Sequence, residues 1–135
     1  DLANDLEMTA FLVVSDGHEA VTVQVVEPTY TTAHVAYRPG TRHSLERGAP
    51  GIALLAGDDP LKDERPEVQI ARESGWAYSE GEVIDGMASV AAPVITNDGS
   101  TAAALAVVHL SLSLNSAVVA PLVTQAATQL RLALS

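Results

Sequence analysis

Apolar and polar positions alternate in the first part of the chain in a way that predicts a β-hairpin. The runs Thr9 to Ser15 and Ala20 to Glu27 are rich in Val and flank an Asp-Gly turn, which is typical of two antiparallel strands. A short helical lead-in is expected over residues 1–8, and a third strand over residues 33–37.

The second part of the chain predicts two helices, three strands and a long final helix. The expected elements are residues 48–56 and 66–74 for the helices, 77–83, 87–95 and 101–112 for the strands, and 116–134 for the final helix. Asn97-Asp98-Gly99 is a turn sequence between the last two strands. The regular part of the final helix is expected to start near Ala120, with Pro121 in its first turn. This order predicts an α+β domain with a mostly antiparallel sheet and helices on its faces.

Length and charge narrow the possible functions. The chain has 135 residues, which fits one domain, and its 47% of hydrophobic residues excludes intrinsic disorder. Its net charge of −10 repels a phosphate backbone, so we expect no direct contact with nucleic acid. The apolar runs are too short to span a bilayer and no signal peptide is visible, so we expect a cytoplasmic protein that does not bind membranes.

Enzymatic motifs are missing from the sequence. It contains no nucleophile elbow, phosphate-binding loop or zinc-protease motif, and its four histidines lack ligand spacing, so no metal, cofactor or catalytic site is expected. Glu80 and Glu82 would share one face of a strand, where paired carboxylates could serve a hydrolase. An exposed sheet edge is the alternative explanation for this pair.

Basic residues gather just before a glycine-rich helix start. Arg38, Arg42 and Arg47 precede Gly48, and the free N–H groups at a helix N-terminus favour an anion such as a carboxylate. Pro50 has no N–H and removes one contact of this kind. A well-capped helix packed on the sheet explains the same residues, and the sequence leaves both interpretations open.

This segment resembles a family motif. The stretch RPGTRHSLERGAPGIALLA resembles the pattern G-x-R-x-P-L-x-x-x-A-x-G-x-A-L-L-A of the effector domain of IclR-type transcription regulators. The later stretch ARESGWAYSEGEVIDGMASVAAPVITNDGSTAAALAVV is similar to that family's second motif. The matching residues there are Arg72, Gly75, Glu82, Gly86, Ala91, Ala92, Pro93 and Val94. Ser44 stands where the family usually has proline, and residues 57–66 form a shorter segment than the family's usual helical insert.

The resemblance implies a fold and a function. It implies that residues 1–135 form a GAF-like (profilin-like) domain with a curved sheet of about six strands, a small-molecule pocket, and assembly into homodimers or tetramers. Family effectors are commonly small organic acids or aromatic compounds, and DNA would be contacted by a helix-turn-helix domain that this chain does not contain. Because Ala106 and Val108 are apolar, we expect a largely hydrophobic effector with one polar end.

The resemblance also assigns pocket positions one by one. The expected ligand-binding residues, with Arg42 added from the basic cluster, are Arg42, Leu45, Ala49, Pro50, Gly51, Ser79, Glu80, Met87, Ser89, Ala106 and Val108. The function expected first is therefore effector sensing by a bacterial regulator. A structural dimerisation module with a vestigial pocket is the alternative, and an enzyme using Glu80, Glu82 or His109 is a third. Apolar residues outside the main stripe of the final helix, including Val118 and Leu132, indicate an interface.

Overall fold

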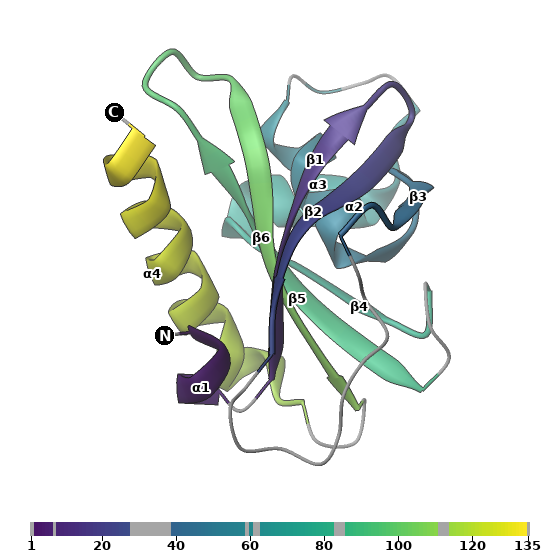
Figure 1. Cartoon of the computed structure of the whole chain (residues 1–135). Coiled ribbons are helices and arrows are strands. Elements are labelled where there is room, and N and C mark those ends of the chain that lie inside the picture. Colours follow the sequence, from purple (N-terminus) through teal and green to yellow (C-terminus); the bar gives the residue numbers. More distant parts are fainter. Residues whose placement is uncertain are drawn as a thin grey trace.

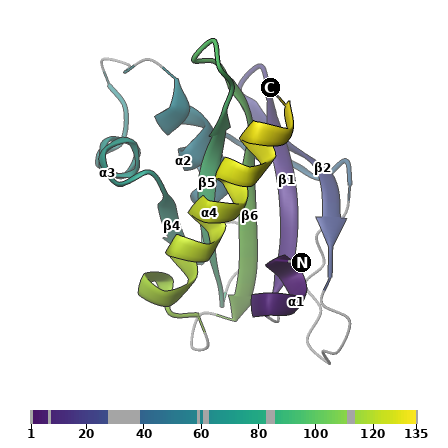
Figure 2. The ribbon, with the colours of Figure 1, turned by 90° about the vertical axis from the view of Figure 1, so that its left-hand side faces the viewer.

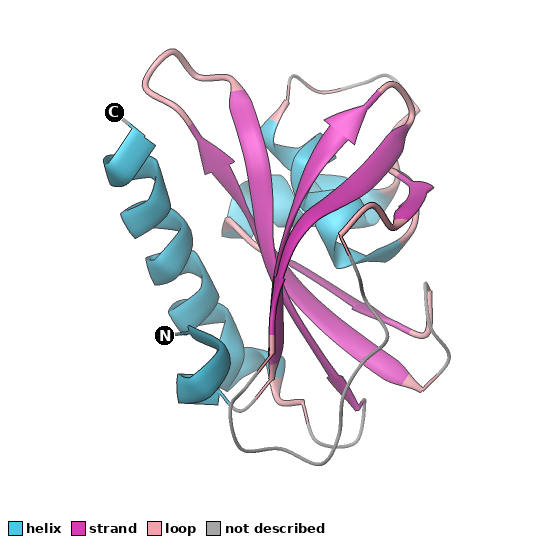
Figure 3. Ribbon diagram, in the orientation of Figure 1, coloured by secondary structure: helices cyan, strands magenta, loops and turns pink. Residues whose placement is uncertain are grey.

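Six antiparallel strands form one curled sheet in the order β3-β2-β1-β6-β5-β4 (Figures 1 and 3). The computed structural model describes residues 2–6, 8–27, 39–58, 60, 63–82, 86–110 and 114–134. The strands are β1 (Thr9–Asp16), β2 (Glu19–Val26), β3 (Arg42–Ser44), β4 (Ala77–Glu80), β5 (Met87–Ile95) and β6 (Thr101–Leu110). The helices are α1 (Leu2–Leu6), α2 (Gly48–Gly57), α3 (Pro66–Ser74) and α4 (Ser116–Leu134). The predicted α+β class with a six-stranded antiparallel sheet is confirmed.

Both predicted hairpins form. Gly17, with φ of 63°, turns the chain between β1 and β2, and Gly99, with φ of 85°, turns it between β5 and β6. Both residues adopt the left-handed conformation that glycine enters without steric cost. In the second turn, the Asp98 carboxylate accepts hydrogen bonds from the Thr96 and Ser100 hydroxyls.

Several element boundaries differ from the prediction. The strand expected at 33–37 lies outside the described residues, whereas β3 pairs with β2 through a three-residue segment too short to show a pattern. β4 ends at Glu80, because Gly81 has φ of 69° and turns the chain. α4 covers Ser116–Leu134, as predicted for the final helix, but its regular part begins at Ser116 and not near Ala120. Asn115 caps this start, because its Oδ1 accepts the N–H of Ala117 at 3.1 Å.

Helices cover both faces of the sheet and define two hydrophobic cores (Figures 1 and 2). On one face, α2 packs on β4, β5 and β6, and α3 packs on α2. On the other face, α4 crosses β5 and β6, and α1 lies beside it. Residues of β6 alternate between the cores, with Ala104, Ala106 and Val108 toward α2 and Ala103, Leu105 and Val107 toward α4. Within the described ranges, no helix combines the length and apolarity needed to cross a bilayer.

Candidate functional site

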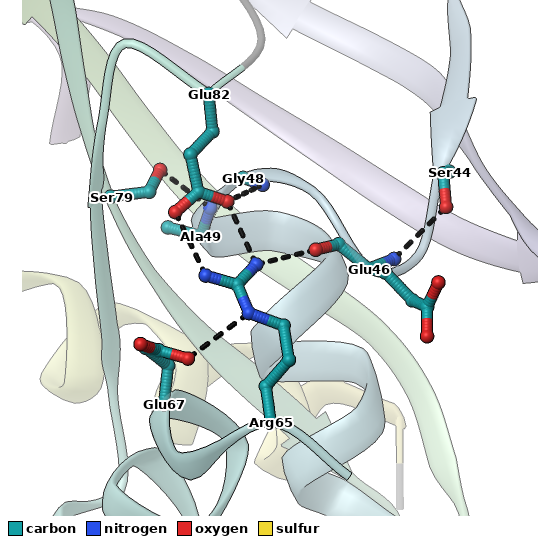
Figure 4. Close-up of polar contacts among 8 residues, drawn as sticks. All are labelled: Ser44, Glu46, Gly48, Ala49, Arg65, Glu67, Ser79 and Glu82. Atoms are coloured by element: carbon teal, nitrogen blue, oxygen red, sulfur yellow. Dashed lines mark hydrogen bonds and ion pairs between the residues drawn. The ribbon is translucent and has the colours of Figure 1, made fainter.

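The N-terminus of α2 is capped by side chains from β4 and the turn after it (Figure 4). The N-cap residue, Arg47, makes no side-chain capping bond. Instead, Glu82 Oε1 accepts the N–H of Gly48 at 2.9 Å, and Ser79 Oγ accepts the N–H of Ala49 at 2.8 Å. Two of the N–H groups that a helix start leaves free are therefore bonded within the protein.

Arg65 clamps the carboxylate that caps the helix. Its guanidinium donates two hydrogen bonds to Glu82, at 2.9 and 3.1 Å, and further bonds to the carbonyl of Glu46 and to the Glu67 carboxylate (Figure 4). The bond from Arg65, with a smaller contribution from the Gly48 N–H, lowers the pKa of Glu82 against the opposing effect of burial. The bond to Glu82 likewise raises the pKa of Arg65. Both groups are therefore charged, and the anion at this helix start is the protein's own.

Most of the predicted ligand-binding residues converge on the face of the sheet beneath α2. Leu45, Ala49, Met87, Ala106 and Val108 belong to one hydrophobic cluster. The remaining members on this face are Pro50 and Gly51, buried in α2, and Ser79 and Ser89, which are buried in β4 and β5. The structure thus gathers nine of the eleven predicted residues around one helix–sheet contact.

The approach of Leu45 to α2 requires the glycine at position 51. A Cβ on Gly51 would lie 2.8 Å from the backbone carbonyl carbon of Leu45, closer than such atoms ever pack. The segment before α2 therefore lies directly against the helix backbone, and the small side chain is needed for this contact.

Arg42 and Glu80 lie away from this face. Arg42 is opposite Val21 on the far side of β3, and its half-exposed guanidinium bonds to Asp16 and Glu19 near the hairpin turn. Glu80 is exposed and accepts a long hydrogen bond of 3.5 Å from the Tyr78 hydroxyl. Because Gly81 turns the chain, Glu80 and Glu82 do not face the same surroundings, and the hypothesis of a carboxylate pair is wrong. Glu80 is exposed on β4, an edge strand of the sheet, as the alternative explanation held.

Two polar residues on the α2 side of the sheet escaped the sequence analysis. Thr22 is fully buried, and its Oγ1 has no hydrogen-bond partner among the described residues. Both ring nitrogens of His43 also lack a hydrogen-bond partner among the described residues. His43 lies opposite Ala20, which belongs to the hydrophobic cluster under α2. Burial, and secondarily the charge of Arg47, lower the pKa of His43, so its ring is neutral at pH 7. Thr22 lies two residues after Ala20 in β2, so the two side chains share one face of the sheet. This alternation was the sequence signal that could have predicted the burial of Thr22.

A cleft of about 580 Å³ opens beside the Arg65–Glu82 pair. Its apolar floor is formed by Leu45, Leu55 and Val68. Its rim contains His18, Ser44, Glu46, Asp63, Glu64 and Arg65. This volume lies in the range of small-molecule sites, and the acidic groups of the rim outnumber the single arginine. Arg65 was missed from sequence because no motif marks it; it only precedes the proline that begins α3.

Comparisons with known proteins agree with this architecture. Residues 61–132 match the family described as the bacterial transcriptional regulator IclR C-terminal domain. No curated protein sequence matches the chain. An IclR transcriptional regulator from Alicyclobacillus acidocaldarius superposes with a TM-score of 0.83 at 22% identity, over 96% of this chain and 62% of that one. The IclR protein of Thermotoga maritima gives a TM-score of 0.81 at 20% identity, over 97% and 63% of the two chains. The chain thus spans less than two thirds of these two regulators.

A third similar structure is a domain solved by itself. The inducer-binding domain of the PobR transcription factor from Acinetobacter, a double mutant in complex with 3-hydroxybenzoic acid, gives a TM-score of 0.77 at 24% identity. The similarity covers 96% of this chain and 93% of that domain. At these identities the structures establish the fold, and the family match covers more than half of the chain. The related proteins are transcription regulators rather than enzymes. This chain belongs to the IclR family, as the C-terminal domain of a bacterial transcription regulator.

Proposed function

We propose that this domain senses a small, largely apolar effector, an organic acid or an aromatic compound, bound between α2 and the sheet. The observation that supports this most directly is the convergence of Leu45, Met87, Ser89 and Val108 beneath α2. Small side chains and hydroxyl groups on an apolar face suit a compact ligand with one polar end. The relative from Acinetobacter is named for binding an aromatic acid at its inducer-binding domain.

The bound effector would act through the arrangement of two or more copies of the chain. We assign the contact between copies to the outer side of α4, where Val118, Leu122, Gln125, Gln129 and Leu132 are all exposed. Their alternating spacing of four and three residues is that of a helix–helix seam. Arg131 is the only charged residue of α4, so two copies with a net charge of −10 each can meet there with little repulsion.

The acidic composition argues against DNA contact by this domain. A chain with 17 acidic and seven basic residues does not attract a phosphate backbone. We propose that a separate helix-turn-helix domain binds the operator in the cytoplasm, and that this domain shifts its position when the effector binds.

A ligand screen tests effector sensing. A compound at 100 times its Kd stabilises the folded state by about 2.7 kcal/mol, a shift readily seen in thermal unfolding. The expected hit is lost in Ser89→Trp, which fills the face beneath α2. It is retained in Ala102→Trp, a matched change at an exposed position of β6. A hit that persists in both variants would contradict the assigned location.

A structural dimerisation module is the second candidate, and the internal capping of α2 favours it. The backbone N–H groups of Gly48 and of Ala49 are each hydrogen-bonded within the protein, without a ligand. Sedimentation then shows self-association that is lost in Leu122→Glu and retained in Ile70→Glu, a control at an exposed site on α3. Self-association combined with a silent ligand screen would support this candidate over effector sensing. A strict monomer at micromolar concentration would contradict the α4 interface.

A further inference from the structure

A second cleft of about 580 Å³ lies on the α4 face of the sheet, opposite the face beneath α2. This α4 cleft is lined by residues 74–76 of the turn between α3 and β4, by three residues of β5 and by one side of α4 (Figure 2). We propose that it is a second binding site, for a small flat carboxylate whose apolar ring lies against Trp76 and whose carboxylate is bound by Arg131. The site is separate from the proposed effector site and does not depend on it.

The apolar part of the cleft suits a flat ring. Trp76, the only tryptophan of the chain, is half-buried and packs against the hydrophobic cluster under α4. Ala92 and Ala120 of the same cluster form a buried floor, and Pro93 and Pro121 also line the cleft. An aromatic ring seated among these small or rigid side chains can contact the indole face-on or edge-on.

The polar part of the cleft supplies one cation. Arg131 is the only charged residue of α4; it is exposed and has no ion-pair partner among the described residues. Long side chains of a helix lean toward its N-terminus, so Arg131 leans over the turn that contains Thr128, which also lines the cleft. A guanidinium group presents planar donors that match the two oxygens of a carboxylate.

The hydroxyl groups of the cleft cannot replace Arg131 as donors. The Thr124 hydroxyl donates to the carbonyl of Pro121, the Thr128 hydroxyl to that of Thr124, and the Ser74 hydroxyl to that of Trp76. Each hydroxyl has a single hydrogen, so these groups can only accept further bonds. The donors left on the lining side chains are the Arg131 guanidinium and the Trp76 indole N–H, which place the carboxylate of a ligand at Arg131.

The acidic residues near the cleft do not occupy this cation. Glu73 and Asp98 adjoin the cleft in sequence, but neither is among its described lining residues. The Asp98 carboxylate is held by the hydroxyls of its own turn. The net charge of −10 weakens the binding of any anion to this chain, so a bound carboxylate needs a direct bond to a free cation. Arg131 provides that cation.

The side of α4 that lines the cleft is distinct from the side assigned above to the contact between copies. Thr124, Thr128 and Arg131 each precede by one residue a member of that contact. The cleft is therefore a feature of the single chain, and its ligand can be tested without reference to assembly.

The single tryptophan reports on this site directly. We would titrate the domain with benzoate and with benzamide, its uncharged counterpart, and follow both the emission of Trp76 and the heat of binding. Benzoate should change the emission and bind roughly five- to tenfold more tightly than benzamide, because a hydrogen bond between charged groups is stronger than one between neutral groups. If neither benzoate nor the longer phenylacetate changes the emission at millimolar concentration, the proposal is overturned.

Matched variants assign the carboxylate to Arg131. Arg131→Gln should lower the affinity for benzoate to about that for benzamide, and Arg42→Gln, which removes the same charge beside the β1–β2 hairpin, should change neither affinity. Thr128→Phe is the second variant if Arg131→Gln fails to fold: its ring occupies the cleft and should abolish the response to both compounds. A folded Arg131→Gln domain that binds benzoate like the wild type would overturn the proposal.

A further outcome separates this site from the effector site. Benzoate binding that produces heat, leaves the emission of Trp76 unchanged and is lost in Ser89→Trp would place the ligand beneath α2. That result would overturn the α4 cleft as its site and support effector sensing. Conversely, a response of Trp76 that is retained in Ser89→Trp and lost in Arg131→Gln would establish the α4 cleft, whatever the ligand screen for the effector shows.

Discussion

Replacing Thr22 by valine should make the domain more stable, although Thr22 is a buried core position. The two side chains have the same shape, so the change exchanges one hydroxyl group for one methyl group. In the native structure the Thr22 side chain is fully buried and its Oγ1 has no partner among the described residues. The hydroxyl loses its hydrogen bonds to water on folding and gains none from the described residues in return.

The size of the effect follows from this lost hydration. An unpaired buried polar group costs about 1–3 kcal/mol, and part of this cost returns when a methyl group takes its place. We therefore expect Thr22→Val to raise the free energy of unfolding by about 1–2 kcal/mol. With an unfolding entropy of about 2.1 cal/mol/K per residue, the 135 residues give about 0.28 kcal/mol/K. The expected rise in Tm is then about 4–7 °C.

Ser89→Ala is the internal comparison for this prediction. Ser89 is also a buried hydroxyl on the α2 side, but its Oγ donates to the carbonyl of Val107 at 2.9 Å. Its removal should lower the free energy of unfolding by about 1 kcal/mol. Both variants are measured by urea unfolding of the ligand-free domain, with the m-value checked for constancy. If Thr22→Val is no more stable than wild type, the hydroxyl is already satisfied and the reasoning is refuted.

Three further predictions concern other parts of the chain. Gly51→Ala should destabilise the domain despite the ~1 kcal/mol helix preference of alanine, because its Cβ would strike the backbone of Leu45; a more stable variant in urea unfolding would refute the contact. Since the pKa of Glu82 is lowered from its usual value near 4.5, its stabilising effect is complete above that pH and is lost as the pH falls through the lower native value. The Tm difference between wild type and Glu82→Gln should accordingly shrink below pH 4.5, and a constant difference would contradict this. The Thr96 and Ser100 hydroxyls lower the pKa of Asp98 to about 2, and an NMR titration that finds an ordinary value would show that the turn does not hold its carboxylate.

The elements that could be predicted from the sequence are those whose pattern is local. β5 at Met87–Ile95 and α3 at Pro66–Ser74 match the expected bounds because turn residues delimit them on both sides. β3 could not be found in this way, because three residues show no period and the strand exists only through its pairing with β2. The bounds of α4 were predicted, but Pro121 led to the expectation that its regular part would start near Ala120, whereas the Asn115 cap starts it at Ser116.

The same distinction between local patterns and long-range contacts applies to the candidate site. Most of the positions that the family resemblance named lie together beneath α2, in agreement with strand parity, and their binding of a ligand stays a prediction. In contrast, Arg65 and Glu82 are 17 positions apart, and only the folded structure brings them together. No local sequence pattern therefore predicts the pair. Arg42 was assigned to the site because it precedes α2 in sequence. Its actual partners, Asp16 and Glu19, come from the β1–β2 hairpin.

If the effector binds beneath α2 and copies of the chain meet on α4, as proposed, the alternation along β6 brings both events to one strand. Ala106 faces α2, and its neighbours Leu105 and Val107 face α4. A ligand beneath α2 and a partner copy on α4 would thus be separated by a single sheet with a helix layer on its far side. A ligand that displaces β6 on the α2 face would move the same strand against α4 on the other face. Because such coupling is reciprocal, the affinity for the effector should depend on protein concentration wherever the two copies are in equilibrium with monomer.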